Sequence, residues 1–206
     1  MSGLIPKFLA NLEQLELNQI PQTNSGKPYK KLKYKGEKYE KLTDNDVKKL
    51  ADALKDNKVF QGELNLSKND LTDLSALYIS SAMKTFKGIK KLNLSKNNLH
   101  SKAGEFLGDA LIENTDYPLE ELNFKDNKLE EYGLRRVIIA ATKNHNLKKL
   151  NLGIITDFGL EFLSQELGDT NLLKIEFEED SSKPFSSKTK NKFIECSEEF
   201  PTIIKC

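Results

Sequence analysis

An eight-residue motif recurs along this chain of 206 residues and constrains its fold more than any other feature. The motif reads LNLSKNDL at residues 64–71, LNLSKNNL at 92–99 and LNFKDNKL at 122–129, and the sequence LNL at 150–152 begins a fourth copy. The copies start 28, 30 and 28 residues apart. Self-similarity at such a period is the signature of a solenoid, in which each unit packs against its neighbours.

The repeat resembles the leucine-rich-repeat family, whose signature L-x-x-L-x-L-x-x-N-x-L is matched by IKKLNLSKNNL at residues 89–99. Long repeats with one helix each are similar to the ribonuclease-inhibitor-like branch. The resemblance implies an α/β leucine-rich-repeat solenoid: a right-handed βα superhelix with a parallel sheet on the concave side and helices on the convex side. It also implies that the motif asparagines Asn69, Asn97 and Asn127 point inward and bond main-chain groups.

We expect an N-terminal cap at residues 1–28, the solenoid at 29–177, and a C-terminal cap or tail at 178–206. In the first segment Leu12, Leu15, Leu17 and Ile20 repeat the L-x-x-L-x-L spacing. However, the strand that we expect around Leu32 follows Leu15 by 17 residues, which is too short for a strand, a crossover helix and a return. We therefore predict a hairpin-like or irregular cap.

Apolar residues at helical spacing predict a helix after Thr43 and further helices at about 72–86, 101–113, 130–143 and 157–167. Their starts are marked by side chains that can accept a hydrogen bond from the first turn, namely Thr43, Thr72, Ser101 and Thr156. Gly88 and Gly168 are the expected C-terminal stops. The fourth repeat departs from the pattern, because Ile155 stands where the asparagine belongs.

Side chains alternate between the two faces of a strand, so the residues between the inward leucines form three rows on the helix-free, concave face. In the first row Glu63, Lys91, Glu121 and Lys149 alternate in charge and can neutralise one another; the full row is Lys31, Glu63, Lys91, Glu121, Lys149, Lys174. The second row is either an amide ladder or a recognition surface: Lys33, Asn65, Asn93, Asn123, Asn151, Glu176. The third row is Lys35, Ser67, Ser95, Lys125, Gly153, Glu178. Lysines gather at one end of this face and acids at the other.

The composition argues against several classes of function. Thirty-two lysines and arginines balance 31 acids, so nucleic acid is not the expected partner. We find no apolar run long enough to span a membrane, no metal-ligand spacing around His100 and His145, and no phosphate-binding loop. We expect no cofactor, no metal and no catalysis. The two cysteines, Cys196 and Cys206, favour a reducing, cytoplasmic setting.

We therefore hypothesise a monomeric, non-catalytic scaffold that binds a protein partner through the concave face and adjoining loops. The candidate contact residues are Lys33, Lys35, Asn65, Ser67, Lys68, Asn93, Ser95, Lys96, Asn123, Lys125, Asp126, Asn151, Glu176 and Glu178.

Three other interpretations stay open. The tail, with Glu198, Glu199, Ile203 and Ile204, resembles type IV secretion signals, which implies a bacterial effector delivered into the host cytoplasm. The family also includes regulators of small GTPases, for which Arg135 and Arg136 are the candidates. The third is self-association through an exposed strand edge, which light scattering would test.

Overall fold

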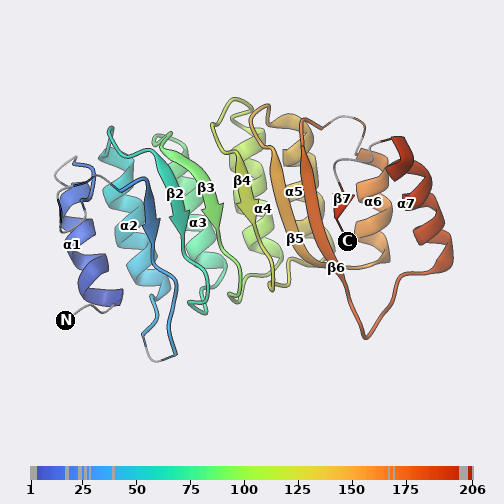
Figure 1. Ribbon diagram of the computed structural model, residues 1–206, viewed down its shortest axis with the longest axis horizontal. Coiled ribbons are helices and arrows are strands. Elements are labelled where there is room, and N and C mark those ends of the chain that lie inside the picture. The colour runs from blue at the N-terminus through green and yellow to red at the C-terminus, as the bar shows by residue number, and fades with distance from the viewer. Residues whose placement is uncertain are drawn as a thin grey trace.

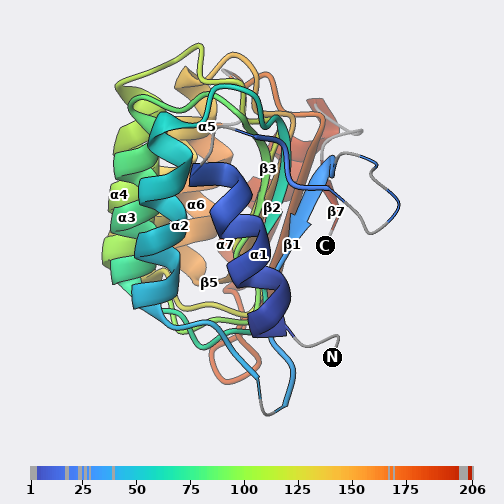
Figure 2. The ribbon, with the colours of Figure 1, turned by 90° about the vertical axis from the view of Figure 1, so that its left-hand side faces the viewer.

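A computed structural model describes residues 4–16, 19–22, 25, 27, 29–38, 40–166, 168, 170–199 and 204–205. The chain forms two layers, a sheet and a row of helices that covers one face of it (Figure 1). Seen from the N-terminal end, the opposite face of the sheet carries no helix (Figure 2). No helix of the described part is long and apolar enough to cross a membrane.

Within the described residues the sheet has seven strands in sequential order, all parallel. The strands are β1 (Lys31–Lys33), β2 (Gly62–Asn65), β3 (Ile89–Asn93), β4 (Glu121–Asn123), β5 (Lys149–Ile155), β6 (Lys174–Glu179) and β7 (Ile204–Lys205). The motif leucines are in register across the first five strands, as the repeat predicts: Leu32, Leu64, Leu92, Leu122, Leu150. The edge strands β1 and β7 are short, which limits pairing with other chains.

Each pair of strands from β1 to β7 is joined by a helix. The helices are α2 (Asp44–Asp56), α3 (Asp73–Met83), α4 (Ser101–Ile112), α5 (Glu130–Lys143), α6 (Asp157–Glu166) and α7 (Ser187–Glu199), with α1 (Leu4–Glu16) preceding β1. The sequence predicted α3 to α6 to within three residues at each end, and it predicted the start of α2 after Thr43. Thr43 caps α2 in a capping box with Asp46, and Thr72 caps α3, both as expected.

The N-terminal segment differs from the prediction, because residues 4–16 form helix α1 and not a hairpin-like or irregular cap. Phe8, Leu12 and Leu15 lie at positions i, i+4 and i+7, so one stripe of the helix is buried against the end of the solenoid. The leucine spacing that suggested a strand also fits this stripe. Leu17 lies outside the described residues.

The motif leucines and the inward faces of the helices form one continuous core. Leu64, Leu66, Leu92 and Leu94 are each at most 1% exposed. The phenol of Tyr117 is also fully buried, and its hydroxyl donates a hydrogen bond to the carbonyl of Phe86 at 3.0 Å. The buried hydroxyl of Tyr34 makes no hydrogen bond within the described part of the chain.

Helices α4 and α5 approach most closely where glycines face each other. A Cβ on Gly104 would lie 2.4 Å from the main-chain oxygen of Gly133, and a Cβ on Gly133 would lie 2.3 Å from that of Ser101. Since both obstacles are backbone atoms, a side chain at either position requires the two helices to separate. The Arg136 guanidinium, which bonds the Asp109 carboxylate, ties the same two helices together on the outside.

A polar residue at the start of one helix caps the helix of the following repeat. The Asp44 carboxylate accepts from the Thr72 amide at 3.0 Å and its hydroxyl at 2.7 Å, and the Asp73 carboxylate accepts from the His100 amide at 2.7 Å. Ser101, expected to cap its own helix, instead accepts from the Gly133 amide on α5 at 2.9 Å. Asp157 serves α7 in the same way through the Ser186 amide. These bonds satisfy helix-start donors that would otherwise lack a partner.

The fourth repeat replaces the asparagine turn by a longer strand. Ile155 is 1% exposed and pairs with Glu179, so β5 and β6 continue past the point where the earlier strands end. A register shift between Asn151 and Ile154 accompanies the change, and Gly153 adopts a φ of 72°. Glu178 therefore lies opposite Ile154, and not opposite Gly153 as the third row predicts.

Candidate protein-binding surface

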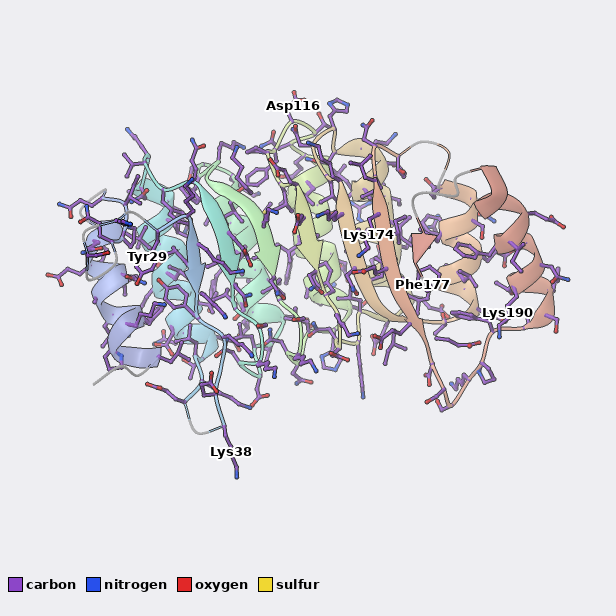
Figure 3. The ribbon with its side chains drawn as sticks, in the orientation of Figure 1. Tyr29, Lys38, Asp116, Lys174, Phe177 and Lys190 are labelled. Carbon is purple, nitrogen blue, oxygen red and sulfur yellow. The ribbon has the colours of Figure 1, made fainter. Side chains whose placement is uncertain are left out.

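The helix-free face of β1 to β6 presents the predicted rows of side chains. Figure 3 shows side chains projecting along the whole sheet, with Lys174 and Phe177 marking β6. Most residues of the three rows are half-buried, which is the exposure expected of side chains that stand on a flat sheet. Parallel sheets are normally covered on both faces, so a sheet covered on one face leaves a broad surface available to a partner.

The first row forms ion pairs across neighbouring strands. Glu121 on β4 lies 2.6 Å from Lys91 on β3 and 3.0 Å from Lys149 on β5, and Lys31 pairs with Glu63. Burial opposes ionisation of Glu121, but the hydrogen bonds from the two lysines outweigh it and hold the pKa of its carboxyl below the usual value. Since the pairs are partly exposed, each contributes about 0–1 kcal/mol to stability. Both glutamates of this row are thus paired, and its four lysines leave the row with a positive excess.

The second row is not an amide ladder. Each asparagine side chain accepts a hydrogen bond from the amide two residues later in the chain, with distances of 3.1 Å for Asn65, 3.0 Å for Asn93, 2.8 Å for Asn123 and 3.0 Å for Asn151. The side chain thereby caps the end of its strand. The side-chain amide nitrogen of Asn151 also donates to the Glu176 carboxylate at 3.1 Å.

Two of the predicted contact residues are not accessible to a partner. Asn65 is 6% exposed and Ser67 is 5% exposed, and the Ser67 hydroxyl donates to the Asn65 side chain at 2.8 Å. The corresponding residues of the next repeat, Asn93 and Ser95, are half-buried and do reach the surface. The sequence could not separate these cases because both repeats carry the same Asn-x-Ser pattern. Asn65 and Ser67 therefore leave the set of candidate contact residues.

The motif asparagines link each turn to the preceding repeat. The Asn69 side chain donates to the carbonyls of Tyr34 at 2.6 Å and Leu66 at 2.9 Å and accepts from the Leu42 amide at 2.9 Å. Asn97 and Asn127 make the corresponding bonds one and two repeats further on. The residues just before them, Lys68, Lys96 and Asp126, have left-handed backbone with φ between 56° and 64°. These turns hold the loop side chains at fixed positions.

The two charged ends of the face differ in a way that the sequence did not indicate. At the C-terminal end Glu176 pairs with Lys174, Glu178 with Lys125, and Glu179 with Lys190 at 3.0 Å. The hydrogen bond from Lys174 lowers the pKa of the Glu176 carboxyl, and the hydrogen bond to Glu178 raises the pKa of Lys125. The acidic end is thus neutralised internally.

Several lysines at the N-terminal end of the face are not paired with a carboxylate within the described structure. Lys33 is exposed and Lys35 is half-buried, and neither meets a carboxylate among the described residues. Lys68, in the loop after β2, is exposed and in the same situation. Lys96, one repeat further on, lies 3.4 Å from Asp126. The uncompensated charge beside the helix-free face is therefore positive.

The residues considered for catalysis serve structural contacts. Arg136 bonds Asp109, and the Arg135 guanidinium lies 4.9 Å from the centre of the Phe162 ring on α6. The His145 imidazole lies 3.0 Å from Asp116 on the surface. Within the described ranges no three His, Cys, Asp or Glu side chains gather as metal ligands.

Comparison with known proteins supports the repeat. No protein-family model matches the chain. Two human (Homo sapiens) proteins are similar: NACHT, LRR and PYD domains-containing protein 13, 30% identical over 131 residues, and protein 14 of the same name, 33% identical over 128 residues. These alignments cover 63% and 61% of this chain but 12% of each human protein. A probable serine/threonine-protein kinase, pats1, of Dictyostelium discoideum is 32% identical over 97 residues, 45% of this chain and 3% of that protein.

Solved structures resemble the chain over nearly its whole length. Leiomodin-1 actin-binding site 2 superimposes with a TM-score of 0.58 at 17% identity, covering 92% of this chain and 88% of that one. The Caenorhabditis elegans tropomodulin C-terminal domain gives a TM-score of 0.58 at 12% identity, covering 93% and 91%. Together with the repeated strand and helix units, these similarities show that the chain has a leucine-rich-repeat fold.

Proposed function

We propose that this chain is a non-catalytic scaffold that binds a protein partner through the helix-free face of β1 to β6. The proposal is carried by one observation: the helices cover one face of a parallel sheet and leave a continuous, half-buried polar surface on the other (Figure 2). The similarity to domains of interaction proteins supports the same class of function. We further propose that the chain acts as a monomer in the cytoplasm.

Rigidity explains how such a surface can bind. The strand ends are capped by Asn93, Asn123 and Asn151, and the turns are fixed by the motif asparagines, so the surface forms before the partner arrives. Binding to a preformed surface costs little ordering entropy. The ion pairs of the first row add polar complementarity without a large desolvation cost, because their charges stay partly exposed.

A pair of matched substitutions tests the surface. Ser95 on the helix-free face and Ser81 on the outer side of α3 are both half-buried, and neither side chain is engaged in a hydrogen bond within the described structure. Affinity capture with the wild type, Ser95→Arg and Ser81→Arg, followed by quantitative mass spectrometry, compares the two faces. We expect a protein that is retained by the wild type and Ser81→Arg and lost with Ser95→Arg. Equal capture by all three proteins would contradict the proposal.

The similarity in fold to leiomodin-1 actin-binding site 2 makes actin the first purified partner to test. Co-sedimentation with filamentous actin and gel filtration with monomeric actin, each with both serine variants, gives a direct answer for this partner. We expect any binding to be lost in Ser95→Arg and kept in Ser81→Arg. Binding that is lost in Ser81→Arg alone would place the contact on the helices.

The alternative of a regulator of a small GTPase requires an arginine that can reach a nucleotide. Arg136 is held by Asp109 and Arg135 is stacked on Phe162, so both would have to leave their contacts. Single-turnover GTP hydrolysis with the wild type, Arg135→Ala and Arg136→Ala tests this. Acceleration by the wild type that either substitution abolishes would favour this function over plain binding.

The finer hypothesis of a bacterial effector rests on the tail. Ile204 belongs to β7 and pairs with Ile175 on β6, so this part of the tail completes the sheet, while Ile203 lies outside the described residues. The relatives reported above are human and Dictyostelium proteins. Secretion therefore has no support beyond the tail sequence. Deleting residues 190–206 and finding translocation from a bacterial host intact would remove the hypothesis.

A further inference from the structure

A pocket of about 330 Å³ lies where the chain leaves β1, β2 and β3 and turns toward the helices. We call it the loop pocket. It adjoins the N-terminal end of the helix-free face, and Lys38 projects from the loop after β1 at its outer limit (Figure 3). Its lining consists of Lys35, Gly36, Glu37, Lys38, Lys41, Lys68, Asp70 and Lys96.

The pocket is built by the close approach of consecutive repeats. The Gly36 amide donates to the Ser67 carbonyl at 2.9 Å, and the Lys68 amide donates to the Ser95 carbonyl at 3.0 Å. A Cβ on Gly36 would lie 1.9 Å from the Lys68 carbonyl oxygen, so a side chain does not fit there. These two amide donors are engaged and are not available to a ligand.

The side chains of the loop pocket carry an excess of positive charge. Five lysines and two carboxylates line it. Lys41 already pairs with Asp70, and Lys96 lies 3.4 Å from Asp126. Lys35 and Lys68 meet no carboxylate among the residues that the structure describes. An anion bound here would gain the attraction of these ammonium groups without first breaking an ion pair.

We propose that the loop pocket binds a run of aspartate or glutamate side chains on the protein partner. The inference rests on the proposed function and names the chemistry of that partner. Nucleic acid fits less well, because phosphate chains require a broad basic surface, whereas this chain balances 32 basic with 31 acidic residues. Glu176, Glu178 and Glu179 at the acidic end of the face are each paired with a lysine. An acidic segment that lies along the sheet is therefore not repelled by unpaired glutamates there.

The pocket can be tested with a defined peptide on the full chain. Fluorescence anisotropy measures binding of a labelled peptide that carries a run of glutamates, and a peptide with glutamine at the same positions is its control. We expect the glutamate peptide to bind and the glutamine peptide to fail, and binding to weaken as ionic strength rises from about 0.05 to about 0.2 M. Equal binding of both peptides would overturn the proposal.

Matched lysine variants locate the site. Lys35→Gln/Lys68→Gln removes two ammonium groups from the pocket, while Lys48→Gln/Lys49→Gln removes two exposed ones from α2 at the same end of the solenoid. We expect the pocket variant to bind the glutamate peptide about tenfold more weakly and the α2 variant to bind like the wild type. Circular dichroism confirms that each variant is folded. Equal weakening in both variants would mean a diffuse charge effect and would refute the pocket.

Two further arms separate this proposal from its neighbours. Inorganic phosphate at millimolar concentration is added as a competitor, and displacement of the peptide by phosphate but not by glutamate would assign the pocket to phosphate and overturn the proposal. The Ser95→Arg variant leaves the pocket lysines in place, so it should still bind the peptide while losing the protein partner. If the peptide fails to bind while Ser95→Arg still abolishes capture, the pocket proposal falls and the scaffold proposal stands.

Discussion

Replacing the motif asparagine Asn69 by alanine should destabilise the chain far more than its small size suggests. The side chain is 3% exposed and joins four main-chain groups of two repeats. In Asn69→Ala the Leu42 amide and the Tyr34 carbonyl lose this partner in a buried setting. The Leu66 carbonyl is less affected, since it also accepts from Asn97 at 3.1 Å.

The expected magnitude follows from these contacts. A buried main-chain group that loses its hydrogen bond costs about 1–3 kcal/mol. Two such groups give about 2–6 kcal/mol, and we take about 3 kcal/mol as the expected loss in the free energy of unfolding. The total free energy of unfolding of a small domain is about 5–15 kcal/mol, so the variant should unfold at a clearly lower denaturant concentration than the wild type.

Urea unfolding followed by circular dichroism measures the effect, with Asn98→Ala as the matched control. Asn98 is exposed in the corresponding loop of the next repeat and its side chain makes no hydrogen bond within the described structure, so its loss should stay within about 0.5 kcal/mol. Asn69→Asp should cost at least as much as alanine at neutral pH, because a carboxylate cannot donate to the three carbonyls. A cost below about 1 kcal/mol for Asn69→Ala, or equal costs for both asparagines, would refute the reasoning.

Four other outcomes follow from single contacts. Burial raises the pKa of the Asp44 carboxyl, but hydrogen bonds from the α3 N-terminus outweigh this effect and lower the pKa. The stabilisation from these bonds is therefore present above about pH 4 and is lost as the pH falls through the lowered pKa. Melting curves of Asp44→Asn should accordingly converge with those of the wild type in acid. Gly104→Ala should destabilise by about 1–3 kcal/mol in thermal unfolding, although helix propensity alone predicts stabilisation. Tyr117→Phe should cost about 1–2 kcal/mol in urea and Tyr34→Phe less, since only the first hydroxyl has an acceptor among the described residues. Ile155→Asn, which restores the family signature, should destabilise by about 2 kcal/mol or more in urea unfolding, because it buries an amide in a continuing strand.

The repeat period predicted most of the solenoid because it indicates both the content of each unit and the register between neighbouring strands. Leucines at 64, 92, 122 and 150 had to lie in register once each unit contained one strand and one helix. The repeat period did not predict the N-terminal helix α1. Leu12 and Leu15 fit the spacing of the repeat and the stripe of an amphipathic helix equally well, and burial of Phe8 decides for the helix. A periodicity shared by two structures does not choose between them.

The caps between repeats were missed for a different reason. Asp44, Asp73 and Asp157 each lie at the start of their own helix, where an acid is favoured by the helix dipole and raises no further question. Their bonds to the following repeat join residues about one period apart, such as Asp44 and Thr72. The recurrence of a polar residue at successive helix starts was the available signal. It connects neighbouring repeats at the surface in the way that the motif asparagines connect them in the interior.

The charge of the candidate binding surface depends on an ion pair that spans two strand spacings. Lys125, just after β4, reaches Glu178 on β6, two strands away, past the register shift between Asn151 and Ile154 on the intervening β5. Two strand spacings amount to about 9.6 Å, which a lysine and a glutamate bridge if nothing stands between them. This pair, together with those of Glu176 with Lys174 and Glu179 with Lys190, neutralises glutamates of the acidic end. We expect the acidic partner that we propose to be attracted to the lysine end and not repelled at the other, so that its orientation is set at β1 to β3.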